Sequence, residues 1–234
     1  MSRAVVLFSG GFDSSVLLFH ATKNYDEVLA LTFDYGQANR EELYAARVMA
    51  EEAGVQIHIE KLNIPFMPVP KGRVDDEVSS YIPNRNLLFI TLAHNYATLN
   101  EFDVVLIGIL APDFTTDKTM LWKFRKWSLE VQTARSVLEN SDPPHYDSRR
   151  EFFDGVSYIL KAASDKVKID APFLDMDKVD IIELAHLYGI KDYVFSYSVS
   201  CNNPIACGQC SKCLELELAD RVFIEKNLGT IKNN

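Results

Sequence analysis

The chain has 234 residues, of which 47% are hydrophobic, and it carries a formal net charge of −9 at pH 7. This length suits one α/β domain with at most a small appendage, and the hydrophobic content can fill its core. Because an acidic chain lacks the clustered basic charge that neutralises nucleic-acid phosphates, we expect no direct nucleic-acid partner. The sequence has no signal peptide and no apolar run that could span a bilayer, so we expect a cytoplasmic protein with no membrane partner.

Strand-like and helix-like segments alternate along the first half of the chain. The hydrophobic pattern predicts strands at 5–8, 27–33, 55–62 and 103–110, and helices at 14–23, 40–54 and 85–99. Between them, residues 63–83 form a proline-rich segment that we interpret as a long loop. The alternation predicts an α/β fold with a doubly wound, mostly parallel sheet, whose ligands bind beyond the carboxyl ends of the strands.

The second half of the chain departs from this pattern at about residue 115. Residues 117–140 read as one long helix that carries both tryptophans and an excess of basic side chains. A further helix, a strand at 167–173 and a helix at 178–189 then restore the alternation. We therefore predict an α/β domain at 1–195, with an inserted helix at about 115–144, and a separate helical tail at 196–234.

The first predicted strand ends in a glycine turn that suits an anion. Two glycines let the backbone approach a phosphate closely, and the amides and dipole of the following helix favour negative charge. The residues of this predicted nucleotide-binding turn are Phe8, Ser9, Gly10, Gly11, Phe12, Asp13, Ser14 and Ser15. Two other strand ends, which carry Tyr35 with Gln37 and Gly108, are expected to line the same pocket.

The acidic residue within this turn admits two interpretations. Asp13 can cap the helix through its carboxylate, or it can hold a magnesium ion that bridges phosphates. No glycine-lysine-serine/threonine sequence follows the turn, so it is not a Walker motif. No G-x-S-x-G sequence surrounds the serines, so a hydrolase nucleophile is not indicated.

All the cysteines of the chain lie in its C-terminal part, at Cys201, Cys207, Cys210 and Cys213. Their clustering predicts a metal site rather than a disulfide framework. Four thiolates with C-x2-C spacing suit tetrahedral zinc and leave no open position, so the zinc would be structural. An iron–sulfur cluster uses the same ligands and remains an alternative.

The segment "SGGFDS" resembles the PP-loop of ATP pyrophosphatases, which release pyrophosphate and leave AMP on an acceptor. Together with "SVSCNNPIACGQCSKCLEL", it resembles the QueC family, the 7-cyano-7-deazaguanine synthases. The segments "LTFDYGQANREEL", "IPNRNLLF", "HYDSRREF" and "DAPFLDMDKVDIIEL" are similar to further motifs of that family. The resemblance implies a HUP-like fold and covers nearly the whole chain except residues 115–144.

The resemblance also implies a chemistry and a set of site residues. The family uses ATP and Mg²⁺ to activate the carboxylate of 7-carboxy-7-deazaguanine, and ammonia then displaces AMP to give an amide. A second ATP converts the amide to a nitrile. The candidate catalytic residues are Asp13; Arg85, Lys178 and Arg149 for carboxylate or phosphate contacts; and Asp113 and Asp147 for the guanine-like edge or the metal.

The chain departs from the family pattern near the expected acceptor site. Ala38 and Asn39 stand where the family has arginine and histidine, and Asn84 stands where it has glycine. The motif before Arg149 lacks its proline, and an insertion precedes it. These departures fit the QueC-like branch of type IV CBASS antiphage systems, where the resemblance implies transfer of the activated deazaguanine to a protein N-terminal amine.

Three functional hypotheses follow. The first is an AMP-forming carbon–nitrogen ligase acting on a 7-deazaguanine carboxylate, with ammonia or a protein amine as the acceptor. The second is another PP-loop enzyme of tRNA modification, which the acidic charge disfavours. The third is a nucleotide-binding regulator without catalysis, which the intact "SGGFDS" turn disfavours. We also expect a homodimer.

Overall fold

The computed structural model describes residues 1–37, 39–64, 82, 84–110, 147, 149–201, 206–208 and 210–231. Within this part of the chain, a five-stranded sheet has the order β3-β2-β1-β4-β5, and every neighbouring pair is parallel. The strands are β1 (Arg3–Leu7), β2 (Glu27–Asp34), β3 (Gln56–Lys61), β4 (Val104–Ile107) and β5 (Lys168–Asp170). This sheet confirms the predicted doubly wound α/β class.

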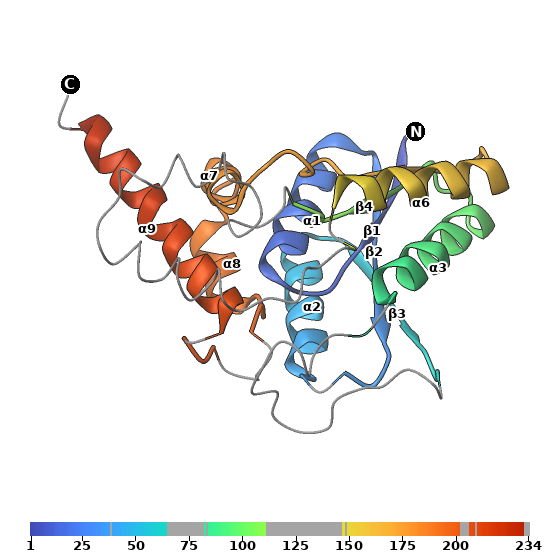
Figure 1. Cartoon of the computed structure of the whole chain (residues 1–234), viewed down its shortest axis with the longest axis horizontal. Coiled ribbons are helices and arrows are strands. Elements are labelled where there is room, and N and C mark those ends of the chain that lie inside the picture. The colour runs from blue at the N-terminus through green and yellow to red at the C-terminus, as the bar shows by residue number, and fades with distance from the viewer. Residues whose placement is uncertain are drawn as a thin grey trace.

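Helices cover both faces of the sheet. They are α1 (Phe12–Asn24), α2 (Glu41–Glu52), α3 (Arg85–Leu99), α6 (Arg150–Ala163), α7 (Lys178–Leu187), α8 (Lys191–Tyr197) and α9 (Ser211–Ile231). Because successive side chains of a strand point to opposite faces, Val6 belongs to the core cluster that includes residues of α1, α2, α7 and α9, whereas Val5 belongs to the cluster that includes residues of α3 and α6. Figure 1 shows α3 and α6 to the right of the strands and α7 to α9 to the left.

The connection order places a ligand site at one end of the central strands. The chain moves from β1 to β2 and β3 on one side, then returns to add β4 and β5 on the other side of β1. In open α/β sheets, ligands bind at the carboxyl ends of the strands where the order reverses in this way. In this sheet that point lies between β1 and β4, which pair directly with each other.

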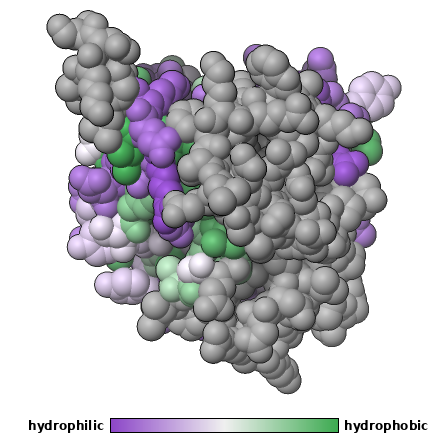
Figure 2. Space-filling model, turned by 60° about the vertical axis from the view of Figure 1, so that its left-hand side comes forward, coloured by the Kyte–Doolittle hydropathy of each residue, from purple (hydrophilic) through white to green (hydrophobic). Residues whose placement is uncertain are grey.

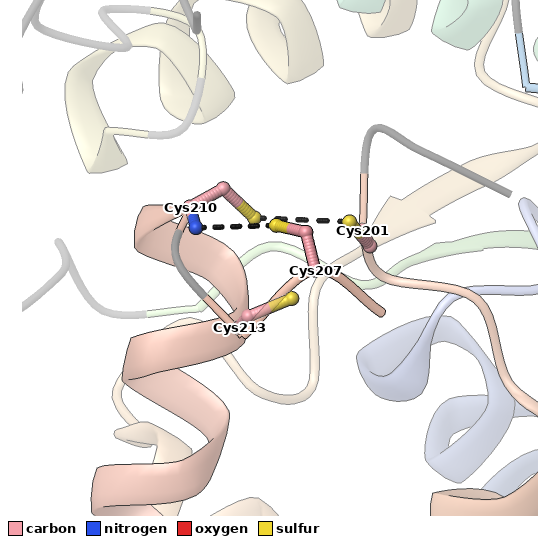
Figure 3. Close-up of side chains that lie close together, drawn as sticks. All are labelled: Cys201, Cys207, Cys210 and Cys213. Atoms are coloured by element: carbon pink, nitrogen blue, oxygen red, sulfur yellow. Dashed lines mark hydrogen bonds between the residues drawn. The ribbon is translucent and has the colours of Figure 1, made fainter. Parts of the chain in front are cut away.

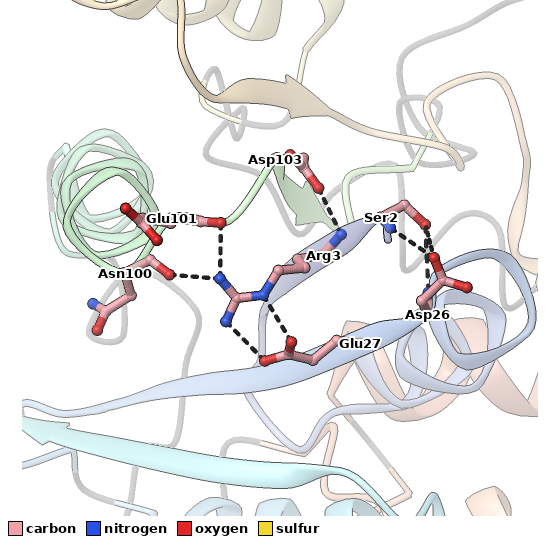
Figure 4. Close-up of polar contacts among 7 residues, drawn as sticks. All are labelled: Ser2, Arg3, Asp26, Glu27, Asn100, Glu101 and Asp103. Atoms are coloured by element: carbon pink, nitrogen blue, oxygen red, sulfur yellow. Dashed lines mark hydrogen bonds and ion pairs between the residues drawn. The ribbon is translucent and has the colours of Figure 1, made fainter.

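The opposite end of the sheet is held by Arg3 (Figure 4). Its guanidinium donates to the carboxylate of Glu27 at 2.7 and 2.9 Å and to the carbonyls of Asn100 and Glu101, both at 2.9 Å. The Arg3 amide donates to Asp103 at 2.7 Å. One side chain thus fastens β1, β2 and the connection into β4 at their amino ends, away from the predicted site.

The observed elements follow most of the sequence predictions. Helix α3 has the predicted bounds, whereas β5 ends at Asp170 because a turn follows, in which the Leu174 amide donates to the Ala171 carbonyl. Helix α8 is not among the elements that the sequence pattern predicts. The predicted loop at 63–83 falls mostly outside the described residues, and the predicted inserted helix at 115–144 falls wholly outside them.

The surface is mixed in character. On the face that Figure 2 shows, hydrophilic side chains lie beside smaller hydrophobic areas in the described part of the chain. Exposed apolar residues include Tyr158 and Ile159 of α6 and Leu187 of α7. None of the described helices combines the length and the apolar character that crossing a membrane requires.

Candidate functional site

The glycine turn follows β1 at the point where the strand order reverses. Gly10 has a φ of +80°, a conformation that favours glycine, and a Cβ there would lie 2.6 Å from the Glu42 carbonyl oxygen of α2. Gly11 is the N-cap of α1 and has an ordinary φ of −76°. Gly108, after β4, packs against the start of α1, since its Cβ would lie 3.6 Å from the Cα of Ser14.

Serine hydroxyls occupy the inside of this turn. The Oγ atoms of Ser9 and Ser14 are 3.0 Å apart, and Ser14 also donates to the Gly11 carbonyl at 3.1 Å. The Gly11 amide donates to Ser9 Oγ at 3.3 Å, and the Phe12 amide donates to Ser200 Oγ at 3.1 Å. Amide and hydroxyl donors therefore gather at the positive end of the α1 dipole, which is the arrangement that binds anions.

Three of the predicted nucleotide-binding residues have side chains in the core. Phe8 and Phe12 are 2% and 1% exposed, and the ring of Phe12 packs edge-on against Phe195 at 4.9 Å. The Ser15 side chain is fully buried, and its hydroxyl has no hydrogen-bond partner among the described residues. The side chains of Phe8 and Phe12 therefore hold the turn in place and are not available to contact a ligand.

Asp13 is paired with the candidate lysine. Lys178 Nζ donates to both carboxylate oxygens of Asp13, at 2.7 and 2.6 Å, and Glu215 Oε2 lies 3.9 Å from the same nitrogen. The side chains of Lys178 and Glu215 are 9% and 13% exposed, and that of Asp13 is 28% exposed. The N-cap residue Gly11 has no side chain, and the Asp13 carboxylate accepts from Lys178, so the capping role considered for Asp13 is not observed. Two helix starts, α1 and α7, thus meet through one ion pair.

Helix α7 has a capping box at its N-terminus, which fixes the position of its first residue, Lys178. The Asp177 carboxylate accepts from the Asp180 amide at 3.0 Å, and the Asp180 carboxylate accepts from the Asp177 amide at 2.9 Å. This capping box satisfies two amide donors at the helix start. A lysine at this position is unfavourable with respect to the helix dipole, so Asp13 supplies the compensating charge.

A second polar group lies beyond β2. Arg85, the first residue of α3, donates from Nη1 to Tyr35 Oη at 3.4 Å. Burial raises the pKa of Tyr35. Burial also raises the pKa of Glu42, and the nearby cations Lys212 and Arg85 offset only part of this increase. A phenol, a carboxyl group and a guanidinium are thereby brought to the carboxyl end of the sheet beside the glycine turn.

Two departures from the family motif have structural explanations. Asn84 has a φ of +59°, which asparagine tolerates better than most residues, so it can stand where the family has glycine. Asn39 is 4% exposed; its Nδ2 donates to the Cys201 carbonyl at 3.0 Å, and its Oδ1 accepts from the Glu41 amide at 3.2 Å. Gln37 is also buried and accepts from the Tyr35 amide at 3.2 Å, so it shapes the turn after β2.

The remaining candidate residues are less completely placed. Arg149 is the N-cap of α6, and its carbonyl accepts from the Phe153 amide. Because a crossover helix runs antiparallel to its strands, this helix start lies toward the carboxyl edge of the sheet. Asp147 is half-buried just before it. Asp113 lies outside the described residues.

The four cysteines come together, as their spacing predicts (Figure 3). Their Sγ atoms all lie within 4.8 Å of one another, and those of Cys201 and Cys210 are 3.9 Å apart. Gly208, with a φ of +67°, allows the tight turn in which the Cys210 amide donates to Cys207 Sγ at 3.3 Å. Cys213 lies in the first turn of α9.

The cluster fits a zinc ion. Sulfur atoms at about 2.3 Å from a tetrahedral zinc are separated from one another by about 3.8 Å. Burial raises the pKa of Cys210 to about 12 and also raises that of Cys213, so a cation is needed to hold these thiols as thiolates. Zinc would then tie α9 to the segment that precedes Cys201.

That segment lies directly on the glycine turn. The Val199 amide donates to the Gly10 carbonyl at 3.0 Å, next to the bond between Ser200 and Phe12. No local pattern in the sequence predicts these contacts, although the position of Ser200 beside a cysteine ligand is a usable signal. Glu215, Glu42 and Asn39 are likewise not among the predicted site residues.

The fold and these groups define the class of protein: an α/β protein with a doubly wound parallel sheet and a C-terminal cysteine cluster that can bind zinc. The family model described as queuosine biosynthesis protein QueC matches residues 3–117 and 129–221, so the chain belongs to the QueC family. This membership implies the use of ATP and a small-molecule substrate, and the chain is a nucleotide-using enzyme. A similar solved structure is the predicted subunit of a tRNA methyltransferase from Methanocaldococcus jannaschii, at 15% identity and a TM-score of 0.39, over 81% of this chain and 74% of that chain.

Proposed function

We propose that the chain is an AMP-forming ligase that activates the carboxylate of 7-carboxy-7-deazaguanine with ATP and releases pyrophosphate. The observation that carries this proposal is the donor-lined turn from Ser9 to Ser14 at the reversal point of the sheet. A site of this kind binds the phosphates of a nucleotide. Membership of the QueC family supports the choice of substrate.

The proposed reaction begins at the α-phosphorus of ATP. A carboxylate oxygen of the substrate attacks it, the bond to the β-phosphate oxygen breaks, and pyrophosphate leaves with the negative charge. An amine then attacks the acyl carbon, AMP leaves, and the amine loses a proton, which gives an amide. In QueC proper, the amide oxygen attacks the α-phosphorus of a second ATP and pyrophosphate leaves; loss of AMP and two protons then gives the nitrile, 7-cyano-7-deazaguanine.

The residues of the turn have distinct roles in this scheme. The amides at the start of α1 and the hydroxyl of Ser9 stabilise the charge of the departing pyrophosphate. Lys178, held by Asp13, supplies a fixed positive charge at the same place. Mg²⁺ neutralises phosphate charge when it accompanies ATP, and Asp13 is the carboxylate of the turn that can hold it. Arg85 is placed to contact the substrate carboxylate.

A second candidate function uses a protein amine in place of ammonia. The family match leaves out residues 118–128, "KTMLWKFRKWS", which lie outside the described residues and carry both tryptophans of the chain. Asn39 is engaged with the Cys201 carbonyl at a position where the family has histidine. An added segment and a changed acceptor side suit the QueC-like CBASS reaction, in which a protein N-terminus receives the activated deazaguanine.

The deciding experiment is AMP formation from ATP with 7-carboxy-7-deazaguanine, with and without ammonium, followed by mass spectrometry of all products. Cyano product with ammonium supports a synthase of queuosine biosynthesis. AMP formation without amide or nitrile supports the protein-amine acceptor. No AMP under either condition overturns the deazaguanine proposal. ATP–pyrophosphate exchange without this acid would instead favour another PP-loop enzyme, and no exchange at all would favour a regulator.

Three further properties are part of the proposal. We place the protein in the cytoplasm as a homodimer, and we treat 1–195 and 196–234 as its nucleotide-binding domain and its zinc-binding tail. Light scattering of the purified chain tests the dimer. Expression of 1–195 alone tests whether the first unit folds without the second.

A further inference from the structure

One donor of the anion site is satisfied by a residue from the far end of the chain. The N-cap of α1 is Gly11, which has no side chain to offer to the first amides of the helix. The Phe12 amide donates instead to Ser200 Oγ at 3.1 Å, across 188 residues of sequence. Ser200 therefore accepts from the first amide of α1 from outside the helix, whereas an N-cap serine accepts from the second or third amide of its own helix.

The position of Ser200 is fixed on both sides. The amide of the preceding residue, Val199, donates to the Gly10 carbonyl at 3.0 Å. The carbonyl of the following residue, Cys201, accepts from Asn39 at 3.0 Å, and its thiol belongs to the cysteine cluster. A Cβ on Gly11 would lie 3.9 Å from Ser200 Oγ, so this hydroxyl lies close to Gly11.

A serine hydroxyl can accept one hydrogen bond and donate another at the same time. At Ser200 the acceptor function is used by Phe12, and its O–H has no acceptor among the described residues. A phosphate group in the turn would bring an anionic oxygen within reach of this hydrogen, since it would bind to the same row of donors.

We propose that Ser200 is an additional phosphate-binding residue, which accepts from the Phe12 amide and donates its own hydrogen to a phosphate oxygen of the bound nucleotide or pyrophosphate. This inference rests on the proposed function, because it assumes that the turn holds the phosphates of ATP. It also makes the segment before the first cysteine ligand a wall of the nucleotide site rather than only part of the zinc-binding tail.

The test is isothermal titration of the full, zinc-loaded chain with magnesium pyrophosphate. The variants are Ser200→Ala, which removes the hydroxyl; Ser200→Thr, which keeps it; and Ser200→Asp, which keeps a helix-capping oxygen but donates nothing and adds charge. Ser196→Ala is the matched control, since that exposed hydroxyl on α8 bonds only to the Asp192 carbonyl among described residues. Zinc content and melting temperature are measured for each variant.

We expect Ser200→Ala to weaken pyrophosphate binding by about tenfold or more, the effect of losing a hydrogen bond to a charged group. Ser200→Asp should bind still more weakly while retaining its zinc, whereas Ser200→Thr and Ser196→Ala should bind like the wild type. If Ser200→Ala lowers the melting temperature but leaves the affinity unchanged, the serine is only a helix cap and the inference is wrong. Absence of binding to the wild-type chain would overturn the proposed function itself.

Discussion

Lys178 on α7 donates to both carboxylate oxygens of Asp13 on α1, while Glu215 on α9 lies 3.9 Å from the same ammonium. One lysine thereby joins the start of α1 to α9, the helix that carries Cys213.

Removal of one partner of this ion pair should destabilise the folded protein. Lys178→Met leaves Asp13 without its partner, and we expect a loss of about 2–4 kcal/mol in the free energy of unfolding, below the range for fully buried pairs because Asp13 is 28% exposed. Urea denaturation measures this loss. AMP formation should fall by at least about a hundredfold, as expected when a fixed charge at the transition state is removed.

The double variant separates the two roles of the pair. Asp13→Asn/Lys178→Met removes both charges of the pair. Its loss in the free energy of unfolding should therefore be smaller than the sum of the two single losses, by about 1–3 kcal/mol. Its activity should remain as low as that of the worse single variant. Additive losses of stability would show that the two side chains do not interact in the folded protein.

The two glycines of the turn should respond differently to alanine. Gly10→Ala places a methyl group 2.6 Å from the Glu42 carbonyl oxygen and 2.7 Å from the Ala46 nitrogen, at a φ of +80°. Backbone strain alone costs about 1–3 kcal/mol, and the clash with α2 adds to it. Gly11→Ala has an ordinary φ and its nearest contact is Ser9 Oγ at 3.3 Å, so its cost should be much smaller.

Thermal and urea unfolding of the two alanine variants measure this difference. Because the contacts of Gly10 are backbone atoms, repacking of side chains cannot relieve them. Equal stability of Gly10→Ala and Gly11→Ala would contradict the described packing of α2 on the turn.

Glu42 gives a prediction about pH. Burial raises the pKa of its carboxyl group in the folded protein above the ordinary value of 4.5. The folded state therefore keeps this proton at a pH where the unfolded state has lost it, and stability decreases as the pH rises from about 4.5 through the folded pKa. Glu42→Gln should be more stable than the wild type at pH 7, and the difference should vanish below the unfolded pKa.

Urea denaturation of Glu42→Gln and of the wild type between pH 4 and pH 8 measures this gain in the free energy of unfolding. A variant that is equally stable or less stable than the wild type at pH 7 would show that Arg85 and Lys212 compensate the buried charge. A gain in stability with a loss of AMP formation would mark Glu42 as a residue kept for function.

Loss of the metal should also weaken ligand binding at the glycine turn. Cys207→Ser/Cys210→Ser removes two of the four thiols, and we expect loss of bound zinc and a lowered melting temperature. Because Val199 and Ser200 lie between the turn and Cys201, pyrophosphate affinity should fall as well. Atomic absorption and titration with pyrophosphate measure both effects. Unchanged affinity in the zinc-free protein would show that the tail does not support the site.

The sequence is sufficient for the framework but not for its long-range contacts. Helix α3 is predicted with its observed bounds, and the glycine turn is placed correctly because apolar strands are easily recognised. The cysteine cluster follows from spacing alone. By contrast, the bond from Phe12 to Ser200 depends on how the tail docks, which no local pattern encodes.

Some site assignments cannot be made from local sequence for the same reason. The sequence predicts that Lys178 contacts a ligand, and its pairing with Asp13 appears only when α1 and α7 are packed together. Asn39 is recognisable as a departure from the family, but its bond to the Cys201 carbonyl requires the fold. The tertiary arrangement thus supplies the partners, while the sequence supplies the chemical groups.

The bond between the Val199 amide and the Gly10 carbonyl has a consequence for biosynthesis on the ribosome. The first strand and its turn are synthesised before the segment that completes the turn, because translation proceeds from the N-terminus. A nascent chain that has not yet reached Ser200 therefore lacks one of the walls of the turn. The glycine turn can take its final form only after the chain through Ser200 has been made and has docked against it.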